Sequence, residues 1–140
     1  MADKLVRDWM RDDVITCHPE TPIMEVAQIM DSKDISALVV VNDSGDAVGV
    51  ISRTDLVNAR FIQPYLKHWV GMTAEHLMTK TVIGISPDAT IDEAAKKIRE
   101  NKIHRLVVTE ESSGRVRPIG ILSVTDLAKH VGEMQTSEDS

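Results

Sequence analysis

The sequence predicts an α/β (α+β-like) protein made of two β-α-β-β-α units, and three observations support this fold class. An internal repeat covers most of the chain. Within each copy, apolar runs of strand length alternate with segments whose apolar residues recur at helical spacing. The hydrophobic fraction of 42% is enough to build a core, and the charged fraction of 27% is ordinary for a soluble protein.

The internal repeat emerges when the sequence is shifted by 68 positions along itself. The matched residues are mostly apolar residues and prolines in the same order: Met10 with Met78, Pro19 with Pro87, Ile23 with Ile91, and Leu38–Val40 with Leu106–Val108. After these strands the shift becomes 71, because the loop at 110–118 is three residues longer than its counterpart at 42–47. Landmarks that keep their order at one period indicate a duplicated unit.

The first copy begins with a short β-rich run that a proline closes. Its predicted elements are a strand at 14–17, a helix opened by Thr21 and Pro22, a strand at 38–41, a turn at 42–46, a strand at 48–51, and a helix from Arg53 to about Phe61. The second copy repeats this order. Because the β-branched runs are continuous, we expect strands that are covered on both faces.

These elements divide the chain into two repeats and a tail. The first repeat, with its N-terminal segment and the connector, is predicted at 1–72, and the second at 73–134. Residues 63–74 are predicted to form the connector. The polar residues 135–140 predict a disordered tail.

Composition argues against several classes of protein. A net charge of −6 with a pI near 5.3 lacks the basic stripe that nucleic-acid binding requires. No segment approaches the roughly 18 apolar residues of a membrane span, and the N-terminus does not resemble a signal peptide. Cys17 is the single cysteine, which excludes an internal disulfide. We therefore expect a cytoplasmic protein without nucleic-acid or membrane partners.

The segments 49–56 and 120–127 each run from an apolar strand through a serine directly into a helix. Ser52 with Asp55, and Ser123 with Asp126, have the spacing of a capping box, in which each cap is worth about 1 kcal/mol. The same helix starts offer free N–H groups to a phosphate, and a carboxylate matches the two hydroxyls of a ribose. Local sequence leaves both interpretations open.

These features together resemble the CBS (cystathionine-β-synthase) domain family, and the tandem copies resemble a CBS pair, or Bateman module. The resemblance is carried by the Met…Val-Ile…Pro opening, the strands at 35–41 and 103–108, and the two Gly-x-x-Ser-x-Thr-Asp segments. It implies repeats around a pseudo-two-fold axis with two clefts between them, and homodimers of such pairs. It also implies regulatory binding of AMP, ADP, ATP, NAD-type dinucleotides or S-adenosylmethionine, without catalysis.

The resemblance also implies roles for single residues. Asp55 and Asp126 would bind ribose. The hydroxyls at the two helix starts would bind phosphate: Ser52, Thr54, Ser123 and Thr125. The run from His104 and Arg105 into Leu106 resembles repeats of the γ subunit of AMP-activated protein kinase, where this pair approaches a phosphate. The adenine would lie against the first strand of each copy, at Thr16, Cys17, Val82, Ile83 and Ile85.

Alternatives remain for each of these residues. Arg105 is also explained as a surface charge paired with Asp126 or Glu110, and His104 as an interface histidine. The first copy has Ser36 and Ala37 in place of this pair, although Arg53 could compensate. If one cleft is the better anion site, we expect the one that uses the second copy. The residues predicted to contact adenine are equally explained as core.

No other constellation supports a chemical function. The five histidines have no metal-ligand spacing, and no nucleophile elbow or Walker loop is present. We therefore predict a regulatory sensor with no required cofactor, whose adenine nucleotide ligand acts as a signal to an unidentified effector protein. The alternative is a ligand-free dimerisation or docking module.

Overall fold

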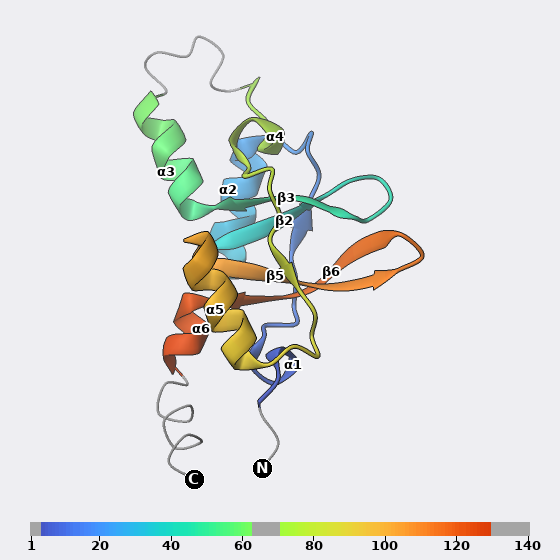
Figure 1. The fold of residues 1–140 in the computed structure, drawn as a ribbon. Helices are drawn as coiled ribbons and strands as arrows, with labels where there is room; N and C mark the ends of the chain where they lie inside the picture. The colour runs from blue at the N-terminus through green and yellow to red at the C-terminus, as the bar shows by residue number, and fades with distance from the viewer. Residues whose placement is uncertain (1–3, 63–70, 130–140) are drawn as a thin grey trace.

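The predicted order of strands and helices is confirmed in both repeats (Figure 1). The structure, a computed structural model, describes residues 4–62 and 71–129. The first repeat contains β1 (Thr16–Cys17), α2 (Ile23–Lys33), β2 (Ala37–Val41), β3 (Ala47–Ser52) and α3 (Arg53–Ile62). The second contains β4 (Gly84–Ile85), α5 (Ile91–Asn101), β5 (Arg105–Ser112), β6 (Arg115–Ser123) and α6 (Val124–Lys129). The predicted tail, and most of the predicted connector, lie outside the described residues.

Each repeat forms one three-stranded sheet, in the order β1-β2-β3 and β4-β5-β6. The first pair of each sheet is parallel, with Thr16 opposite Val39 and Gly84 opposite Val107. Parallel strands need a crossover connection, which α2 and α5 provide. In Figure 1 the sheets lie one above the other, with the four longer helices α2, α3, α5 and α6 on one side and the two hairpins on the other.

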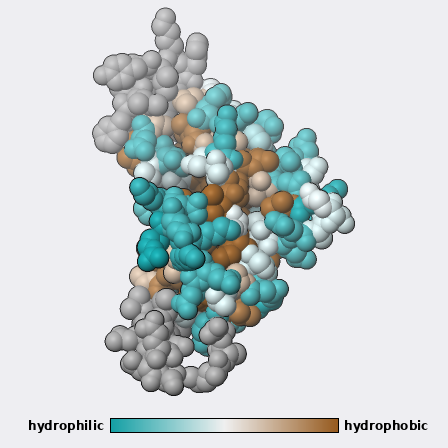
Figure 2. All heavy atoms as spheres, viewed as in Figure 1, coloured by the Kyte–Doolittle hydropathy of each residue, from teal (hydrophilic) through white to brown (hydrophobic). Residues whose placement is uncertain are grey.

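Strand β2 explains why the apolar runs are continuous, because all its residues are buried. Leu38 and Val40 pack in the core of the first repeat. Val39 and Val41, which point to the opposite face, pack with Val107 of the second repeat. The expectation that strands are covered on both faces is confirmed here. Hydrophobic residues accordingly gather in the middle of the face seen in Figure 2, between hydrophilic ones.

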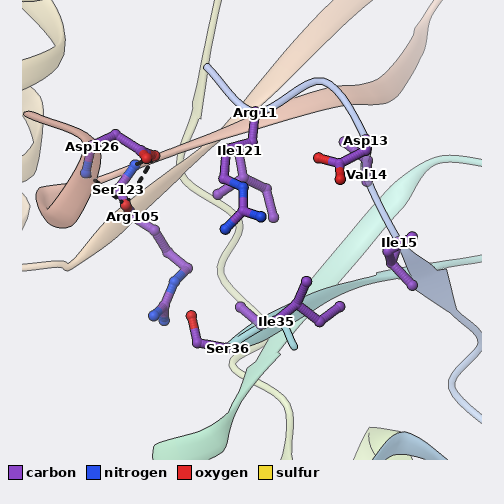
Figure 3. Close-up of a pocket in the computed structure, with 11 residues that line it drawn as sticks. Arg11, Asp13, Val14, Ile15, Ile35, Ser36, Arg105, Ile121, Ser123 and Asp126 are labelled. Atoms are coloured by element: carbon purple, nitrogen blue, oxygen red, sulfur yellow. Dashed lines mark hydrogen bonds between the residues drawn. The ribbon is translucent and has the colours of Figure 1, made fainter. Parts of the chain in front are cut away.

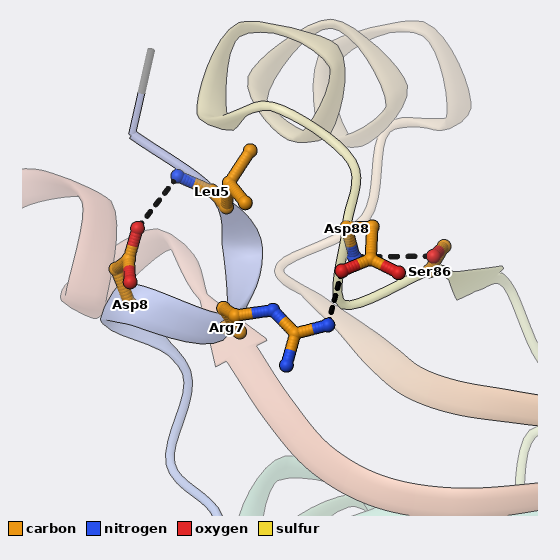
Figure 4. Close-up of polar contacts among 5 residues, drawn as sticks. All are labelled: Leu5, Arg7, Asp8, Ser86 and Asp88. Atoms are coloured by element: carbon orange, nitrogen blue, oxygen red, sulfur yellow. Dashed lines mark hydrogen bonds and ion pairs between the residues drawn. The ribbon is translucent and has the colours of Figure 1, made fainter. Parts of the chain in front are cut away.

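The N-terminal segment packs on the second repeat. It contains a short helix, α1 (Val6–Trp9), whose Val6 and Trp9 lie in one buried cluster with Ile85. Arg7 of this helix forms an ion pair with Asp88, which precedes α5 (Figure 4). The start of the chain therefore completes the core of the repeat that lies farthest from it in sequence.

The segment before the second repeat makes the reciprocal contacts. Its short helix, α4 (Ala74–Leu77), places Ala74 and Leu77 in the core of the first repeat. Both segments continue into isolated antiparallel pairings with the last strand of the sheet they cover: Arg11 with Ile121, and Thr79 with Val50. Each core is thus completed by a segment that sequence order assigns to the other half.

Two glycines make this close crossing possible. A Cβ on Gly120 would lie 2.9 Å from the backbone oxygen of Arg11, and one on Gly49 would lie 3.0 Å from that of Thr79. We expect Gly49→Ala and Gly120→Ala each to lower the free energy of unfolding by about 1–3 kcal/mol, because a backbone strand cannot move aside cheaply. Urea denaturation measures the effect.

Gly71→Ala is the matched control for these two substitutions, because a Cβ there meets nothing within 4 Å. It should change stability by no more than about 0.5 kcal/mol. If all three substitutions lower the free energy of unfolding equally, the close backbone crossing is not the cause of the loss.

The thiol of Cys17 is 4% exposed. Burial, with a smaller contribution from Glu25, raises its pKa from 9.0 to about 11. The folded state therefore retains this proton more tightly than the unfolded chain. The resulting stability is present below pH 9.0 and is lost as the pH rises towards about 11.

We expect the free energy of unfolding to fall more steeply across this range in the wild type than in Cys17→Ala, measured by urea denaturation at successive pH values. The same dependence of the free energy of unfolding on pH in both proteins would contradict this prediction.

Candidate functional site

Both helix starts form the predicted capping boxes. The backbone N–H and the hydroxyl of Ser52 donate to Oδ2 of Asp55 at 2.8 and 3.0 Å, and the Asp55 N–H donates back to the hydroxyl at 3.3 Å. Ser123 and Asp126 repeat the arrangement at 2.9, 2.9 and 3.1 Å. Within the described residues, Oδ1 of either carboxylate accepts no hydrogen bond. Capping is confirmed, and it leaves one oxygen of each carboxylate available to a ligand.

Asp55 opens onto a cleft of about 290 Å³, here named the Asp55 cleft. The first repeat contributes the start of α3, with Ser52, Thr54 and Asp55. The second repeat contributes the segment before β4 and residues 102–105 at the entry to β5. The cleft is therefore built from both repeats.

A second cleft, of about 50 Å³, lies beside Asp126 and is named the Asp126 cleft (Figure 3). It is the pseudo-two-fold counterpart of the first, because its lining residues align with those of the Asp55 cleft. The aligned pairs are Arg11 with Thr79, Asp13 with Thr81, Ile15 with Ile83, Ser36 with His104, Ala37 with Arg105, and Asp126 with Asp55. Each cleft therefore combines the helix start of one repeat with the strand entry of the other, meaning the residues that lead into its middle strand, β2 or β5.

This combination determines which carboxylate faces the basic residues of the second repeat. Lys102, His104 and Arg105 line the cleft of Asp55, which belongs to the first repeat. We expected the better anion site to use the second copy. In the Asp55 cleft the second copy supplies the strand entry, whereas the carboxylate and the helix start come from the first copy. Local sequence does not show this combination, because it joins residues about fifty positions apart.

Arg105 lies between the two clefts and lines both. Figure 3 shows its side chain extending towards Ser36. Burial lowers the pKa of Arg105, and the charge of Asp55 partly offsets this effect. Among the described residues it forms no ion pair with Asp126 or Glu110. Its half-buried position between clefts differs from that of an exposed, paired surface charge.

Other predicted site residues lie away from the clefts. Cys17 and Ile85 are buried in the cores of their repeats. Thr16 is exposed, and Val82 packs between the sheets. Arg53 pairs with Asp34 at the surface, 3.4 Å away. Thr125, predicted to bind phosphate, is exposed and absent from the lining of either cleft. Of the residues predicted to contact adenine, Ile83 lines the Asp55 cleft, whereas Val82 and Ile85 line a separate pocket beside β4 and β5.

The sequence predictions do not include several residues that line the clefts: Arg11, Asp13, Thr79, Thr81 and Lys102. Most precede the first strand of a copy, where the chain crosses to the other repeat. The repeat alignment pairs Arg11 with Thr79 and Asp13 with Thr81, but it carries no sign that these positions face a cavity. Their location depends on the crossing.

Two other kinds of feature are absent from residues 4–62 and 71–129. No group of three or more His, Cys, Asp or Glu residues is placed to hold a metal ion there. No helix in these ranges has the length and apolar character needed to cross a membrane.

Comparison with protein families finds a match to the CBS domain at residues 6–61 and 74–133. Inosine-5′-monophosphate dehydrogenase of Halobacterium salinarum is 31% identical over 129 residues, which cover 92% of this chain and 24% of the dehydrogenase. The γ-3 subunit of 5′-AMP-activated protein kinase of Bos taurus is 30% identical over 111 residues, covering 76% of this chain and 22% of the subunit. The chain spans about a quarter of these relatives.

Solved structures agree with this family match. A CBS domain pair in complex with 5′-methylthioadenosine and S-adenosyl-L-methionine superposes with a TM-score of 0.82 and 28% identity, covering 95% of this chain and 99% of that chain. The protein CBSX2 in complex with AMP has the same fold, with a TM-score of 0.75 and 24% identity over 94% of this chain and 98% of that chain.

The capping boxes generate a prediction about stability. Ser52→Ala and Ser123→Ala each remove the hydroxyl that accepts from an N–H of the first turn. We expect each to lower the free energy of unfolding by about 1 kcal/mol in thermal or urea denaturation. Thr125→Ala, at an exposed position of the same turn, is the control. If Thr125→Ala costs as much as Ser123→Ala, the capping bonds do not carry the stabilisation.

Proposed function

Because the chain belongs to the CBS domain family, as a tandem pair of repeats, we propose that it is a regulatory module that binds an adenosine nucleotide in the Asp55 cleft. One observation carries the proposal. The cleft brings the carboxylate of Asp55 and the hydroxyls at the start of α3 together with His104 and Arg105 of the other repeat. These are groups that can bind the ribose hydroxyls and the phosphate of a single nucleotide.

The ribose would be held by Asp55. Oδ2 of this carboxylate is engaged by Ser52, whereas Oδ1 accepts nothing from the described residues. A ribose diol presents two hydroxyl donors, which match the acceptor oxygens of a carboxylate. Because the capping bonds orient the side chain before any ligand arrives, binding costs little side-chain entropy.

The phosphate nearest the ribose would lie between the start of α3 and the entry to β5. α3 is ten residues long, and in its first turn the N–H of Arg53 donates to the Ser36 carbonyl and that of Asp55 to the Ser52 hydroxyl. The N–H of Thr54 and the positive end of the helix dipole are left for a phosphate. Thr54 adds a hydroxyl, and Arg105 adds a guanidinium whose fork fits two phosphate oxygens. These groups come from both repeats, so a bound phosphate would join them.

The adenine would lie against aliphatic side chains of the same cleft: Val50, Ile83, Ile103 and Val107. Such faces hold an aromatic ring by apolar contact. With an aromatic content of 3%, the chain has few rings on which a base could stack. The two CBS structures in complex with AMP, and with 5′-methylthioadenosine and S-adenosylmethionine, support an adenosine ligand as the class.

The role would be to sense energy or cofactor level through AMP, ADP, ATP, NAD or S-adenosylmethionine. A ligand that contacts both repeats stabilises one relative arrangement of them, and couplings of this kind are typically about 1–3 kcal/mol. The change would be passed to an effector protein, or through a homodimer of CBS pairs. In this proposal the chain itself performs regulation and no catalysis.

A ligand-free dimerisation module is the second candidate, and exposed apolar side chains favour it. Met24 of α2, Val57 of α3 and Val124 of α6 are 52%, 54% and 42% exposed. Contact between helices of two copies would bury them. Dimerisation alone does not need Asp55 and Arg105 in one cleft, so nucleotide binding distinguishes the two candidates.

Isothermal titration with AMP, ATP, NAD and S-adenosylmethionine tests the proposal. We expect at least one ligand to bind, and Asp55→Ala to weaken it by roughly 10- to 100-fold, the loss of a charged hydrogen-bond acceptor. Asp126→Ala is the matched control, because it removes an equivalent capping bond from the other cleft.

Comparable losses in both variants would point to lost stability instead of a ribose contact. A loss in Asp126→Ala alone would place the ligand in the Asp126 cleft. If none of the four ligands binds the wild type, the dimerisation module replaces the sensor.

A further inference from the structure

Lys102 lines the Asp55 cleft from a position that neither the capping boxes nor the family resemblance identifies. It is the C-cap residue of α5 and lies three positions before Arg105. The N–H of Lys102 donates to the Arg99 carbonyl at 3.3 Å, and that of Ile103 to the Ile98 carbonyl at 3.1 Å. These bonds fix the turn from which the lysine side chain extends. Lys102 is exposed, whereas Arg105 is half-buried, so the lysine lies at the mouth of the cleft.

The backbone of Lys102 is in the left-handed region, with φ of 54°. A helix end in this conformation usually carries glycine or asparagine, because a Cβ there costs free energy. Among the described residues, the side chain of Lys102 forms no hydrogen bond or ion pair. Asp34 adopts the same conformation at the end of α2, so the conformation belongs to the repeat, whereas the unpaired charge of Lys102 at the edge of the cleft is available to an anionic ligand.

The equivalent position of the other repeat carries the opposite charge. Asp34, with φ of 52°, ends α2 as Lys102 ends α5, and its carboxylate pairs with Arg53. The next aligned positions change in the same sense. The Asp55 cleft has His104 and Arg105 where the first repeat has Ser36 and Ala37. The positive charge is therefore concentrated at one of the two strand entries, the one that faces Asp55.

The basic groups of the cleft lie at different depths, so each would meet a different part of a bound nucleotide. With its ribose at Asp55, a ligand places its first phosphate by the start of α3 and the half-buried Arg105. Further phosphates must extend outwards, where Lys102 and His104 are the exposed basic residues of the lining. We propose that Lys102 makes the Asp55 cleft prefer adenosine di- and triphosphates over AMP. This inference rests on the proposed function, since it names the ligand class of the same cleft.

Isothermal titration with adenosine, AMP, ADP and ATP in magnesium-free buffer tests the inference on the full chain. We expect the wild type to bind ATP roughly tenfold more tightly than AMP, which corresponds to one charge-assisted contact. Lys102→Ala should bring the ATP and AMP affinities together while it leaves AMP affinity nearly unchanged. Lys102→Arg should keep the preference.

Two further variants separate this effect from stability and from net charge. Lys102→Gly removes the charge and relieves the left-handed backbone, so it should lose the preference without loss of thermal stability. Lys96→Ala removes a lysine from the same helix at a position outside the cleft, where it pairs with Glu100 at 4.0 Å, and should keep the preference.

Each outcome bears on the inference in a defined way. Loss of the ATP preference in Lys102→Ala and Lys102→Gly, with its retention in Lys96→Ala, supports it. Equal wild-type affinity for AMP and ATP overturns it, and so does a preference that survives in Lys102→Gly. Those results leave adenosine binding itself intact. Absence of binding by all four compounds also overturns the inference, and the proposed function is overturned with it only if NAD and S-adenosylmethionine fail to bind as well.

Discussion

The structure depends on two short backbone pairings that join each repeat to a segment from the other half of the chain. The N–H of Arg11 donates to the Ile121 carbonyl, and the reverse bond is also formed, both at 2.9 Å. Thr79 and Val50 make the same pair of bonds at 2.8 and 3.1 Å. Because α1 and α4 complete the cores beyond these pairings, neither repeat can bury its apolar surface without the other.

The same crossing creates the clefts. The crossing segments lie beside the capped helix start of one repeat and the strand entry of the other, so each cleft takes its carboxylate and its opposite wall from different repeats. A ligand bound there would contact both halves at once. In the proposed function, its binding would therefore be linked to the arrangement of the repeats by geometry, without any need for a moving lid.

Duplication made the two clefts alike in backbone, and divergence of a few side chains made them different in chemistry. The capping boxes agree to within a few tenths of an ångström. The walls differ, because Lys102 and Arg105 stand where the first repeat has Asp34 and Ala37. Arg105 is common to the lining of both clefts.

Asp55 and Asp126 combine stability with the proposed binding role. One oxygen of each carboxylate closes a capping box, and the other is unused within the described residues. Local sequence left capping and ribose binding as competing interpretations. Capping engages Oδ2 and leaves Oδ1 to the proposed ribose contact, so the two roles are compatible in one side chain.

The duplicated unit, its strand and helix order, and the two capping boxes could all be predicted from local sequence. These features depend on neighbouring residues: apolar spacing sets the element type, and a serine three residues before an aspartate sets a helix start. The resemblance to CBS domains rested on the same local motifs, and the family match agrees with it.

Only the tertiary structure decided which residues face a cavity. Cys17 lies on a strand predicted to contact adenine, yet it is buried in the core of the first repeat. Lys102, at the end of a helix, lines the Asp55 cleft. The face that a strand or helix end presents to solvent depends on which distant segment covers its other side. That choice is made by the crossing of α1 and α4, which no local pattern encodes.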